Sequence, residues 1–337
     1  MLPPRWVRRV VLAPGIVLLT VAVLGALPVL LLVAAVASPL LPGRWRPLRA
    51  GWMVGLHLLL ETAVLIALFV LWVASGFGAA IRSPRFERAH YDVVRAYLRL
   101  MFAEARRVLH VEVAVEGPEP SSMSGRPLLV FSRHAGPGDS FMLVHALVNW
   151  YDREPRVVLK DTLQWDPAVD VLLNRLPNRF IRPGGGTPPI RELASGLDDD
   201  DAFVIFPEGG NFTARRRARG IARLRAQGLL AEAEQAEQLR NVLAPRPGGV
   251  VAALEQAPDA DVVWVAHSGL DHLVSVADVW RALPMDSVVR MRWWRVPAAD
   301  VPRGETAQVA WLNDWWARID DWIGAQPRDP GRRRAAP

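Results

Sequence analysis

Hydrophobic residues are distributed unevenly along the 337-residue chain, and their spacing divides it into two regions. Two long apolar runs come first, at residues 10–37 and 51–74, and each is long enough to enter or cross a bilayer as a helix. Pro14 and Pro28 interrupt the first run and predict kinks in it. From about Ser83 onward the pattern becomes mixed and amphipathic, with helical and strand-like periodicities in turn.

The second region alternates between predicted strands and predicted helices. Short apolar or alternating runs bounded by turn residues predict strands at residues 110–115, 127–131, 156–159, 202–206, 261–265 and 287–296, with a brief apolar stretch at 180–181. Helical spacing predicts helices at residues 86–108, 140–151, 165–176, 189–197, 214–240, 250–256 and 305–323. This alternation predicts an α/β fold with a mostly parallel central sheet flanked by helices, preceded by an N-terminal hydrophobic helical region.

These patterns predict three parts of the chain. Residues 1–82 form a membrane-associated helical segment, and residues 83–326 form the α/β domain. Residues 327–337, rich in arginine and proline, form a disordered basic tail.

Arginines flank both ends of both apolar runs: Arg5, Arg8 and Arg9, then Arg44, Arg46 and Arg49, and finally Arg82, Arg85 and Arg88. The distribution of positive charge therefore does not select an orientation. Two arrangements remain open: a pair of spans with both termini in the cytoplasm, or a helical pair that enters one leaflet. A cleaved signal peptide ending at Ala37 is a third, which the length of the first run and the second run behind it disfavour. Glu61, inside the second run, is a candidate for a functional role; the alternatives are that it sits near the interface or pairs with His57 or a flanking arginine.

The composition narrows the possible functions. The sequence contains no cysteine, which excludes disulfides, thiolate catalysis and cysteine-ligated metals. The formal net charge is +6, and Lys160 is the sole lysine, so nearly all basic residues are arginines. Arginine together with 14 tryptophans suits contact with anionic lipid headgroups. No nucleic-acid-binding module is recognisable, and no nucleic-acid partner is expected.

The strand predicted at residues 127–131 leads to the main candidate for chemistry. His134 follows this strand, and Asp139 stands five residues later at the start of the next predicted helix. An imidazole titrates near neutral pH and can remove a proton from an alcohol, while a carboxylate on its other nitrogen fixes the tautomer. The alternative is a structural histidine beside an ordinary N-cap aspartate.

Two other chemically capable side chains follow predicted strands. Glu208 comes just after the strand at 202–206, and His267 just after the strand at 261–265. Because functional sites of parallel α/β sheets gather at the carboxyl ends of the strands, we expect His134, Glu208 and His267 to lie near one another.

With these segments identified, the chain resembles the glycerophospholipid acyltransferase superfamily, which contains the 1-acylglycerol-3-phosphate and lysophospholipid acyltransferases. The resemblance spans residues 128–265 and depends on the His-x4-Asp motif at 134–139 and on Phe-Pro-Glu-Gly at 206–209. Arg182, after Phe180 and Ile181, stands where the family has an acceptor-binding arginine. The elements Asn-Phe-Thr at 211–213, Gly-Leu at 228–229 and Leu-x-Pro-Arg at 243–246 resemble the lysocardiolipin and lysophosphatidylinositol subgroup.

The resemblance implies a membrane-bound acyltransferase, with residues 83–326 as its acyltransferase domain. It would move a fatty acyl group from acyl-CoA or acyl-carrier protein to the hydroxyl of a lysophospholipid, 1-acyl-sn-glycerol-3-phosphate being the expected acceptor. His134 would be the general base and Asp139 its orienting acid. The substrate-binding candidates are Arg182, Glu208, Gly209, Gly210 and Arg246. Neither a cofactor nor a metal is expected, and the domain is expected on the cytoplasmic face of the membrane.

The chain also departs from the family pattern. Gly210 and Asn211 replace the Thr-Arg pair of many members, and residues 266–268, Ala-His-Ser, occupy the usual place of a proline. Two alternatives therefore remain: an acyltransferase for another acceptor, such as an amino-lipid or a glycolipid, and a lipid-binding protein without catalysis. His267 and His272 were weighed as metal ligands, but no carboxylate stands at a suitable spacing, so no metal site is predicted.

Overall fold

The computed structural model describes residues 2–41, 43, 45–136, 138–181, 186–271, 273 and 276–327. The chain divides into two compact units, each described here by itself. The first comprises Met1–Val111, Arg156–Gly185 and Trp280–Asp286, and the second comprises Glu112–Pro155, Gly186–Val279 and Ser287–Pro337. The three parts predicted from the sequence, with boundaries at residues 82 and 326, stay a prediction; most of the predicted tail lies outside the described residues.

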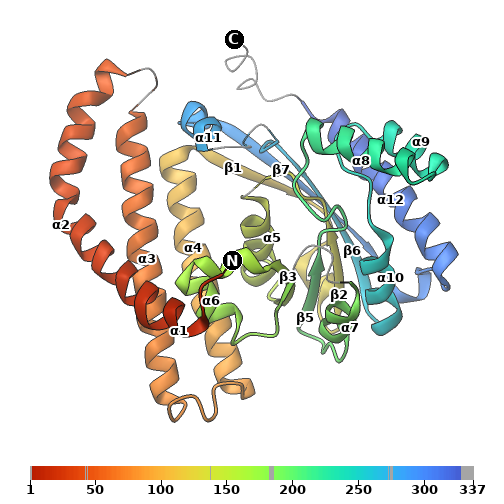
Figure 1. Cartoon of the computed structure of the whole chain (residues 1–337), viewed down its shortest axis with the longest axis horizontal. Coiled ribbons are helices and arrows are strands. Elements are labelled where there is room, and N and C mark those ends of the chain that lie inside the picture. Colours follow the sequence, from red (N-terminus) through yellow and green to blue (C-terminus); the bar gives the residue numbers. More distant parts are fainter. Residues whose placement is uncertain are drawn as a thin grey trace. The chain divides into compact units, whose positions relative to one another are not determined.

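The first unit is mainly helical. Its N-terminal helical stretch consists of α1 (Arg5–Val7), the π-helical turn η1 (Arg8–Leu12), α2 (Ala13–Ala37) and the 3-10 turn η2 (Ser38–Leu40). α3 (Arg46–Ala74) runs beside α2, and α4 (Pro84–Leu109) packs against α3 (Figure 1). The unit also holds most of β3 (Glu154–Lys160), then η4 (Asp161–Trp165), α6 (Pro167–Leu173) and β4 (Arg179–Ile181), with β3 and β4 paired in parallel.

Two helical stretches of this unit, Arg5–Leu40 and Arg46–Ala74, are long and apolar enough to cross a membrane, judged by length and composition alone. Their surroundings differ. In the most apolar window, 6% of the first stretch is buried and 28% of the second. One face of α3 packs Val64 and Leu68 against Ala168 and Val171 of α6. The second stretch is therefore docked on the remainder of its unit more extensively than the first, which has a mixture of half-buried and exposed residues.

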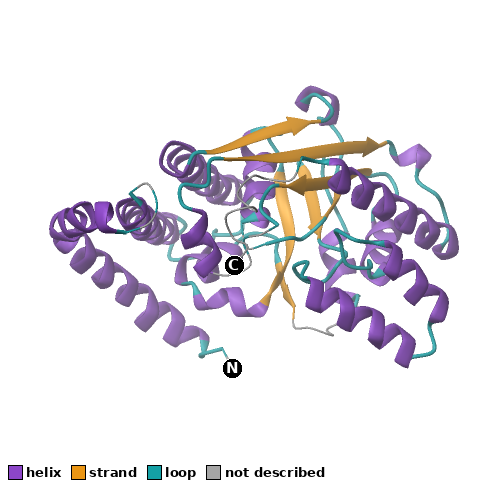
Figure 2. Ribbon diagram, turned by 90° about the horizontal axis from the view of Figure 1, so that it is seen from above, coloured by secondary structure: helices purple, strands orange, loops and turns teal. Residues whose placement is uncertain are grey.

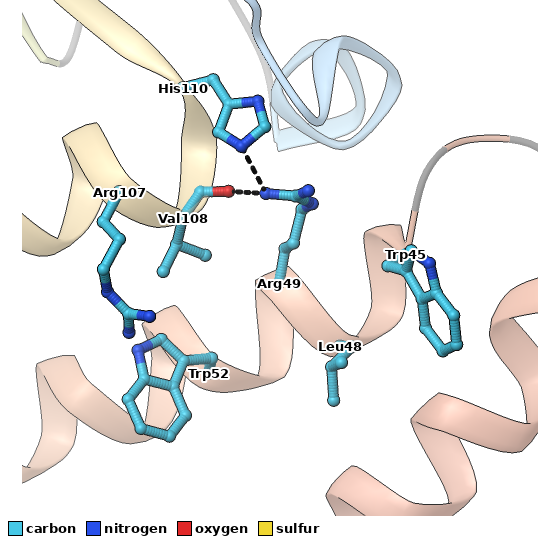
Figure 3. A pocket seen from close by; sticks show the side chains of 7 residues that line it. All are labelled: Trp45, Leu48, Arg49, Trp52, Arg107, Val108 and His110. Carbon is cyan, nitrogen blue, oxygen red and sulfur yellow. Dashed lines mark hydrogen bonds between the residues drawn. The ribbon is translucent and has the colours of Figure 1, made fainter.

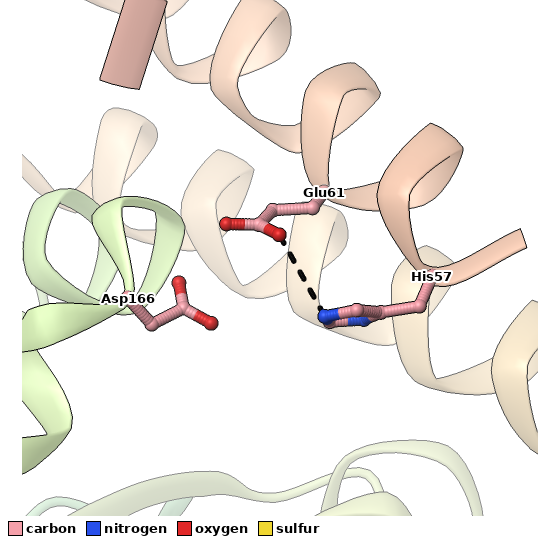
Figure 4. Close-up of side chains that lie close together, drawn as sticks. All are labelled: His57, Glu61 and Asp166. Atoms are coloured by element: carbon pink, nitrogen blue, oxygen red, sulfur yellow. Dashed lines mark ion pairs between the residues drawn. The ribbon is translucent and has the colours of Figure 1, made fainter. Parts of the chain in front are cut away.

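Charged groups fix the helices of the first unit to α6. The buried carboxylate of Asp170 accepts from Arg8 at 2.7 Å and pairs with Arg9 at 3.4 Å. His57 and Glu61 of α3 pair at 3.6 Å, which is one of the arrangements that the sequence left open, and Asp166 lies close by (Figure 4). The candidate ligand atoms of these last three residues lie within 4.8 Å of one another. The expectation of no metal site stays a prediction.

Among the described residues of the second unit, five strands are hydrogen-bonded in the order β1-β7-β6-β2-β5. They are β1 (Val111–Glu116), β2 (Leu128–Ser132), β5 (Asp201–Ile205), β6 (Asp261–Ser268) and β7 (Ser287–Val296). β2 pairs in parallel with both β5 and β6, and β7 is antiparallel to β6. Every residue of β2, β5 and β6 is buried, which requires layers on both faces of these strands.

Helices cover these strands on both sides (Figure 2). The helical elements are η3 (Pro120–Met123), α5 (Asp139–Asn149), α7 (Pro188–Ala194), α8 (Ala214–Ala226), α9 (Leu230–Gln238), α10 (Pro247–Gln256), α11 (Val276–Ala282), η5 (Ala298–Asp300) and α12 (Glu305–Ala325). α12 stacks Trp315 on Trp264 of β6 at a ring separation of 5.5 Å. The predicted fold class, a mixed α/β architecture with mostly parallel strands flanked by helices, is confirmed. α11, which bridges the two units in sequence, was not predicted.

The prediction of one long helix at residues 214–240 was wrong. The structure has two helices, α8 and α9, separated at Gly228. Gly228 has a φ of 76°, and the N–H groups of Gly228 and Leu229 bond back to carbonyls of the last turn of α8. A glycine adopts this left-handed conformation readily, so it ends a helix that the polar periodicity alone would continue.

Candidate active site

Parallel strands bring three loops of the second unit together. β2 leads into residues 133–138 and then α5, β5 leads into residues 206–213, and β6 ends at Ser268. The register places Leu128 beside both Ala202 and Asp261, so the three strands end at a common edge. The N–H of Phe212 donates to the carbonyl of His134 at 2.7 Å, which ties the second loop to the first.

The structure brings His134 and Asp139 together as predicted. His134 Nδ1 lies 3.0 Å from both carboxylate oxygens of Asp139. The carboxylate is buried, whereas the imidazole side chain is 17% exposed. The ring also packs on Phe206, with centroids 4.7 Å apart. With Nδ1 held by the acid, Nε2 is the ring nitrogen left to take a proton.

Asp139 is the first residue of α5, and its carboxylate organises the loop before it. Its Oδ2 accepts from the N–H groups of Ala135 at 2.6 Å and Gly136 at 3.0 Å, and its Oδ1 accepts from Ser140 N–H at 2.6 Å. Burial alone would raise the pKa of Asp139. Hydrogen bonds from His134 and His267 outweigh burial and hold that pKa well below its usual value. A depressed pKa favours the ionised carboxylate at neutral pH.

His267 lies beside the loop of His134, as the strand ends predicted, but the sequence did not indicate its contact with Asp139. Its Nε2 lies 3.4 Å from Asp139 Oδ2 and 3.3 Å from the carbonyl oxygen of Arg133. The side chain is buried, and its Nδ1 has no hydrogen-bond partner among the described residues. One carboxylate thus lies between two imidazoles. The departure at residues 266–268 was the available signal, although it does not reveal which group His267 contacts.

Glu208 faces the protein interior. Its Oε1 accepts from the N–H of His134 and its Oε2 from the N–H of Leu243, both at 2.8 Å. Burial raises the pKa of Glu208 to about 7, although nearby Arg133 opposes this rise. Of the two roles considered for Glu208, these contacts match bracing of the loops; they do not expose the carboxylate to an acceptor hydroxyl.

Arg133 is a second buried brace beside the site. Its guanidinium donates to the carbonyl oxygens of His267 at 2.6 Å and Asn241 at 2.9 Å, and it pairs with Asp271 at 2.6 Å. The Arg133 charge lowers the pKa of Asp271, although burial acts in the opposite direction. These bonds hold the end of β6 against the loop that carries His134.

The other substrate-binding candidates gather around the turn after β5. Gly209 has a φ of 65°, and a Cβ built on it would lie 3.1 Å from the guanidinium of Arg246. The N–H of Gly209 donates to Phe206 at 3.0 Å, so this N–H group is used within the turn. A Cβ on Gly210 would lie 3.3 Å from Arg216 Nη1. Two arginines therefore flank the two glycines. Arg182 and His272 lie outside the described residues.

Comparison with known proteins came to two findings. Residues 112–266 match the family model described as Acyltransferase. The chain is also similar to a solved structure, the 1-acyl-sn-glycerophosphate (LPA) acyltransferase PlsC from Thermotoga maritima. The two share 17% sequence identity at a TM-score of 0.49, over 80% of this chain and 97% of the other. A search of curated protein sequences found no match. The matched residues run from β1 to β6 and include His134, Asp139 and Glu208.

Proposed function

Residues 112–266 of this chain match the Acyltransferase family model, and on that premise we propose that the protein acylates a lysophospholipid. The proposed acceptor is 1-acyl-sn-glycerol-3-phosphate, and the proposed donor is a soluble thioester, acyl-CoA or acyl-carrier protein. The observation that carries this proposal is the pairing of a partly exposed imidazole with a buried, ionised carboxylate at 3.0 Å.

The proposed reaction is a direct transfer. His134 Nε2 removes the proton of the acceptor hydroxyl while the hydroxyl oxygen attacks the carbonyl carbon of the thioester. The tetrahedral intermediate then collapses, the carbon–sulfur bond breaks, and the imidazolium returns its proton to the leaving thiolate. Asp139 stabilises the imidazolium between these two steps. No acyl-enzyme is required, and the sequence has no Gly-x-Ser-x-Gly elbow that would supply a serine nucleophile.

Arg246 is the proposed contact for the acceptor phosphate. Its guanidinium lies against Gly209, in the loop that also bonds to the backbone of His134. Arginine recognises phosphate through two parallel hydrogen bonds, and a glycine at this position leaves room for the guanidinium. Arg182 retains its predicted role as a second phosphate contact.

Membrane association is proposed through the apolar surfaces of α2 and α3. Of the two arrangements left open by the sequence, packing within the first unit favours entry into one leaflet. α3 lies along α4, which carries charged residues from Arg85 to Arg107 and cannot itself lie in hydrocarbon. A bilayer-held lysolipid and a soluble donor would then meet at the membrane surface. Because thioester donors are cytosolic, we propose the cytoplasmic face.

Acyl transfer by the purified full chain tests this function. A panel of lysophosphatidate, other lysophospholipids, an amino-lipid and a glycolipid is offered with an acyl-CoA, and release of free thiol is measured. We expect lysophosphatidate to be acylated and His134→Ala to reduce the rate by about a hundredfold or more. His145→Gln, which removes a buried imidazole from α5, is the matched control. Transfer only to the glycolipid or amino-lipid would refute the acceptor, and no transfer to any acceptor would favour a non-catalytic lipid-binding protein.

A further inference from the structure

A second candidate site lies in the first unit, where α3 begins and α4 ends. A cavity of about 590 Å³ opens there. Its lining residues are Trp45, Leu48, Arg49, Trp52, Arg107, Val108 and His110 (Figure 3). This volume falls within the range of small-ligand sites. None of these residues belongs to the unit that contains His134.

Two arginines are held at the wall of this cavity. Arg49 donates to the carbonyl of Val108 and lies 3.3 Å from His110 Nε2. Arg107 lies over the Trp52 ring, with its guanidinium carbon 5.7 Å from the centroid, and pairs with Glu104 at 2.6 Å. Figure 3 shows both side chains at the lining of the same opening, Arg49 extending from α3 and Arg107 from α4. Glu104, which pairs with Arg107, also accepts from Trp52 Nε1 at 3.0 Å, so Arg107 and Trp52 share one carboxylate.

The local charge is positive. α3 has no acidic residue in its first turn, and the last turn of α4 carries Arg106 and Arg107. The carboxylates near the opening are Glu104, paired with Arg107, and Asp286, which bonds to His110 at 2.8 Å. The first peptide N–H groups of α3 add partial positive charge there, whereas the last carbonyls of α4 add partial negative charge, which the bond from Arg49 to Val108 offsets in part. An anionic ligand would therefore be favoured.

The cavity also has an apolar side that continues into a membrane-directed surface. Trp45 and Trp52 are 48% and 40% exposed, and the apolar stretch Arg46–Ala74 starts at this point. Tryptophan concentrates where the bilayer core meets water, and arginine there contacts headgroups. The ligand indicated by this combination carries a phosphate next to an apolar body.

We propose that this cavity binds one anionic glycerophospholipid of the surrounding bilayer. Arg49 and Arg107 would contact its phosphate, and Trp52 and Leu48 its glycerol and the start of its acyl chains. The site would hold the N-terminal end of α3 at the level of the lipid headgroups. This proposal rests on the proposed membrane association and not on acyl transfer.

The test is flotation of the full chain with phosphatidylcholine vesicles that contain or lack phosphatidylglycerol. The test variant is Arg49→Gln/Arg107→Gln. The control is Arg85→Gln/Arg88→Gln, which removes the same charge from the opposite end of α4. The measured quantity is the ratio of binding to vesicles with and without phosphatidylglycerol. We expect this ratio to favour phosphatidylglycerol for the wild type and the control. In the test variant the ratio should fall on the order of tenfold further than in the control.

The outcomes separate the two proposals. Equal losses in both double variants would reduce the effect to general surface charge and overturn the site. The melting temperature is also compared in inorganic phosphate and in micelles of a short-chain phosphatidylglycerol. If phosphate raises it as much as the lipid does, the cavity binds free anions and the lipid site is overturned. Failure of the wild type to float with any vesicle would instead refute membrane association. Arg107→Gln alone, at a side chain that is 62% exposed, repeats the test if the double variant unfolds.

Discussion

Replacing Asp139 with asparagine is the most demanding test of the candidate active site, because the change preserves shape and removes charge. The two carboxylate oxygens accept from different backbone donors: Oδ1 from Ser140, and Oδ2 from Ala135 and Gly136. An amide group has one acceptor and two donors. Whichever way it turns, its NH₂ faces at least one backbone N–H.

The effect on stability follows from this conflict. The less damaging orientation keeps the oxygen toward Ala135 and Gly136 and leaves the Ser140 N–H without its acceptor. Losing one hydrogen bond to a charged group costs about 1.5–3 kcal/mol. We therefore expect Asp139→Asn to lower the free energy of unfolding by about 2–3 kcal/mol at neutral pH, measured by urea denaturation.

This stability difference should depend on pH in one direction. Since the pKa of Asp139 is depressed in the folded protein, its contribution is fully present above its unfolded pKa of about 3.9 and is lost as pH falls toward the folded pKa. The wild type and the variant should therefore converge in acid. A constant difference between pH 7 and the lowest pH at which the protein folds would contradict the ionised carboxylate.

The effect on rate comes from the missing charge. Asp139 lies 3.0 Å from His134 Nδ1. A unit charge about 3 Å away stabilises an imidazolium by about 5 kcal/mol at an effective dielectric constant of about 20, equivalent to about four powers of ten in rate. Partial exposure of the ring reduces this figure, and the loss cannot exceed that of His134→Ala, so we expect kcat to fall by about 10² to 10³.

Thiol release under saturating donor and acceptor measures this loss. The comparison includes His134→Ala and the double variant, because residues that act as one unit do not contribute additively. The double variant should be no slower than His134→Ala alone. A folded Asp139→Asn protein that keeps a tenth or more of wild-type kcat, or strictly additive losses, would refute the proposed pair.

Three other perturbations extend the test. Burial raises the pKa of Glu208 to about 7 in the folded protein, so the wild type should lose about 3 kcal/mol of stability as pH rises from about 4.5 to 7. Urea denaturation of Glu208→Gln should lack this dependence on pH. An unchanged dependence would contradict the buried carboxyl. His267→Gln weakens one contact to Asp139, at 3.4 Å, and should lower kcat about two- to tenfold with KM unchanged in steady-state assays; an effect confined to KM would argue against positioning of the acid. Gly209→Ala places a Cβ at a left-handed position and against Arg246, so it should lower the free energy of unfolding by about 1–2 kcal/mol in thermal melts. It should also raise the KM for the acceptor. A loss of stability without any change in KM would exclude Arg246 from acceptor binding.

Local features of the site could be predicted from the chain alone. His134 lies in the loop that follows the buried strand β2, and Asp139, separated from it by four residues, is the first residue of α5. Such short-range geometry leaves the carboxylate few places other than the ring nitrogen and the intervening N–H groups. The pairing of His57 with Glu61 was predictable for the same reason, since residues four apart share a helix face.

Contacts between distant residues were not predictable in this way. Glu208 was proposed for substrate hydroxyls as well as for bracing, and only the fold shows both of its oxygens on backbone donors. His267 was considered as a metal ligand, although in the structure it lies against Asp139. Each of these contacts joins segments that are far apart in sequence, and each depends on how three strands align.

By itself the sequence determined the kinds of elements and much of their order, because side-chain periodicity reflects which faces of a helix or strand must be buried. It also determined the local pairing of His134 with Asp139, because only four residues separate them and this restricts where the acid can go. Tertiary structure decided the remainder: the turn at Gly228, the inward direction of Glu208, the sharing of Asp139 by two imidazoles, and the docking of α3 on α6. These features arise from strand register and from packing between distant segments, which no local pattern encodes.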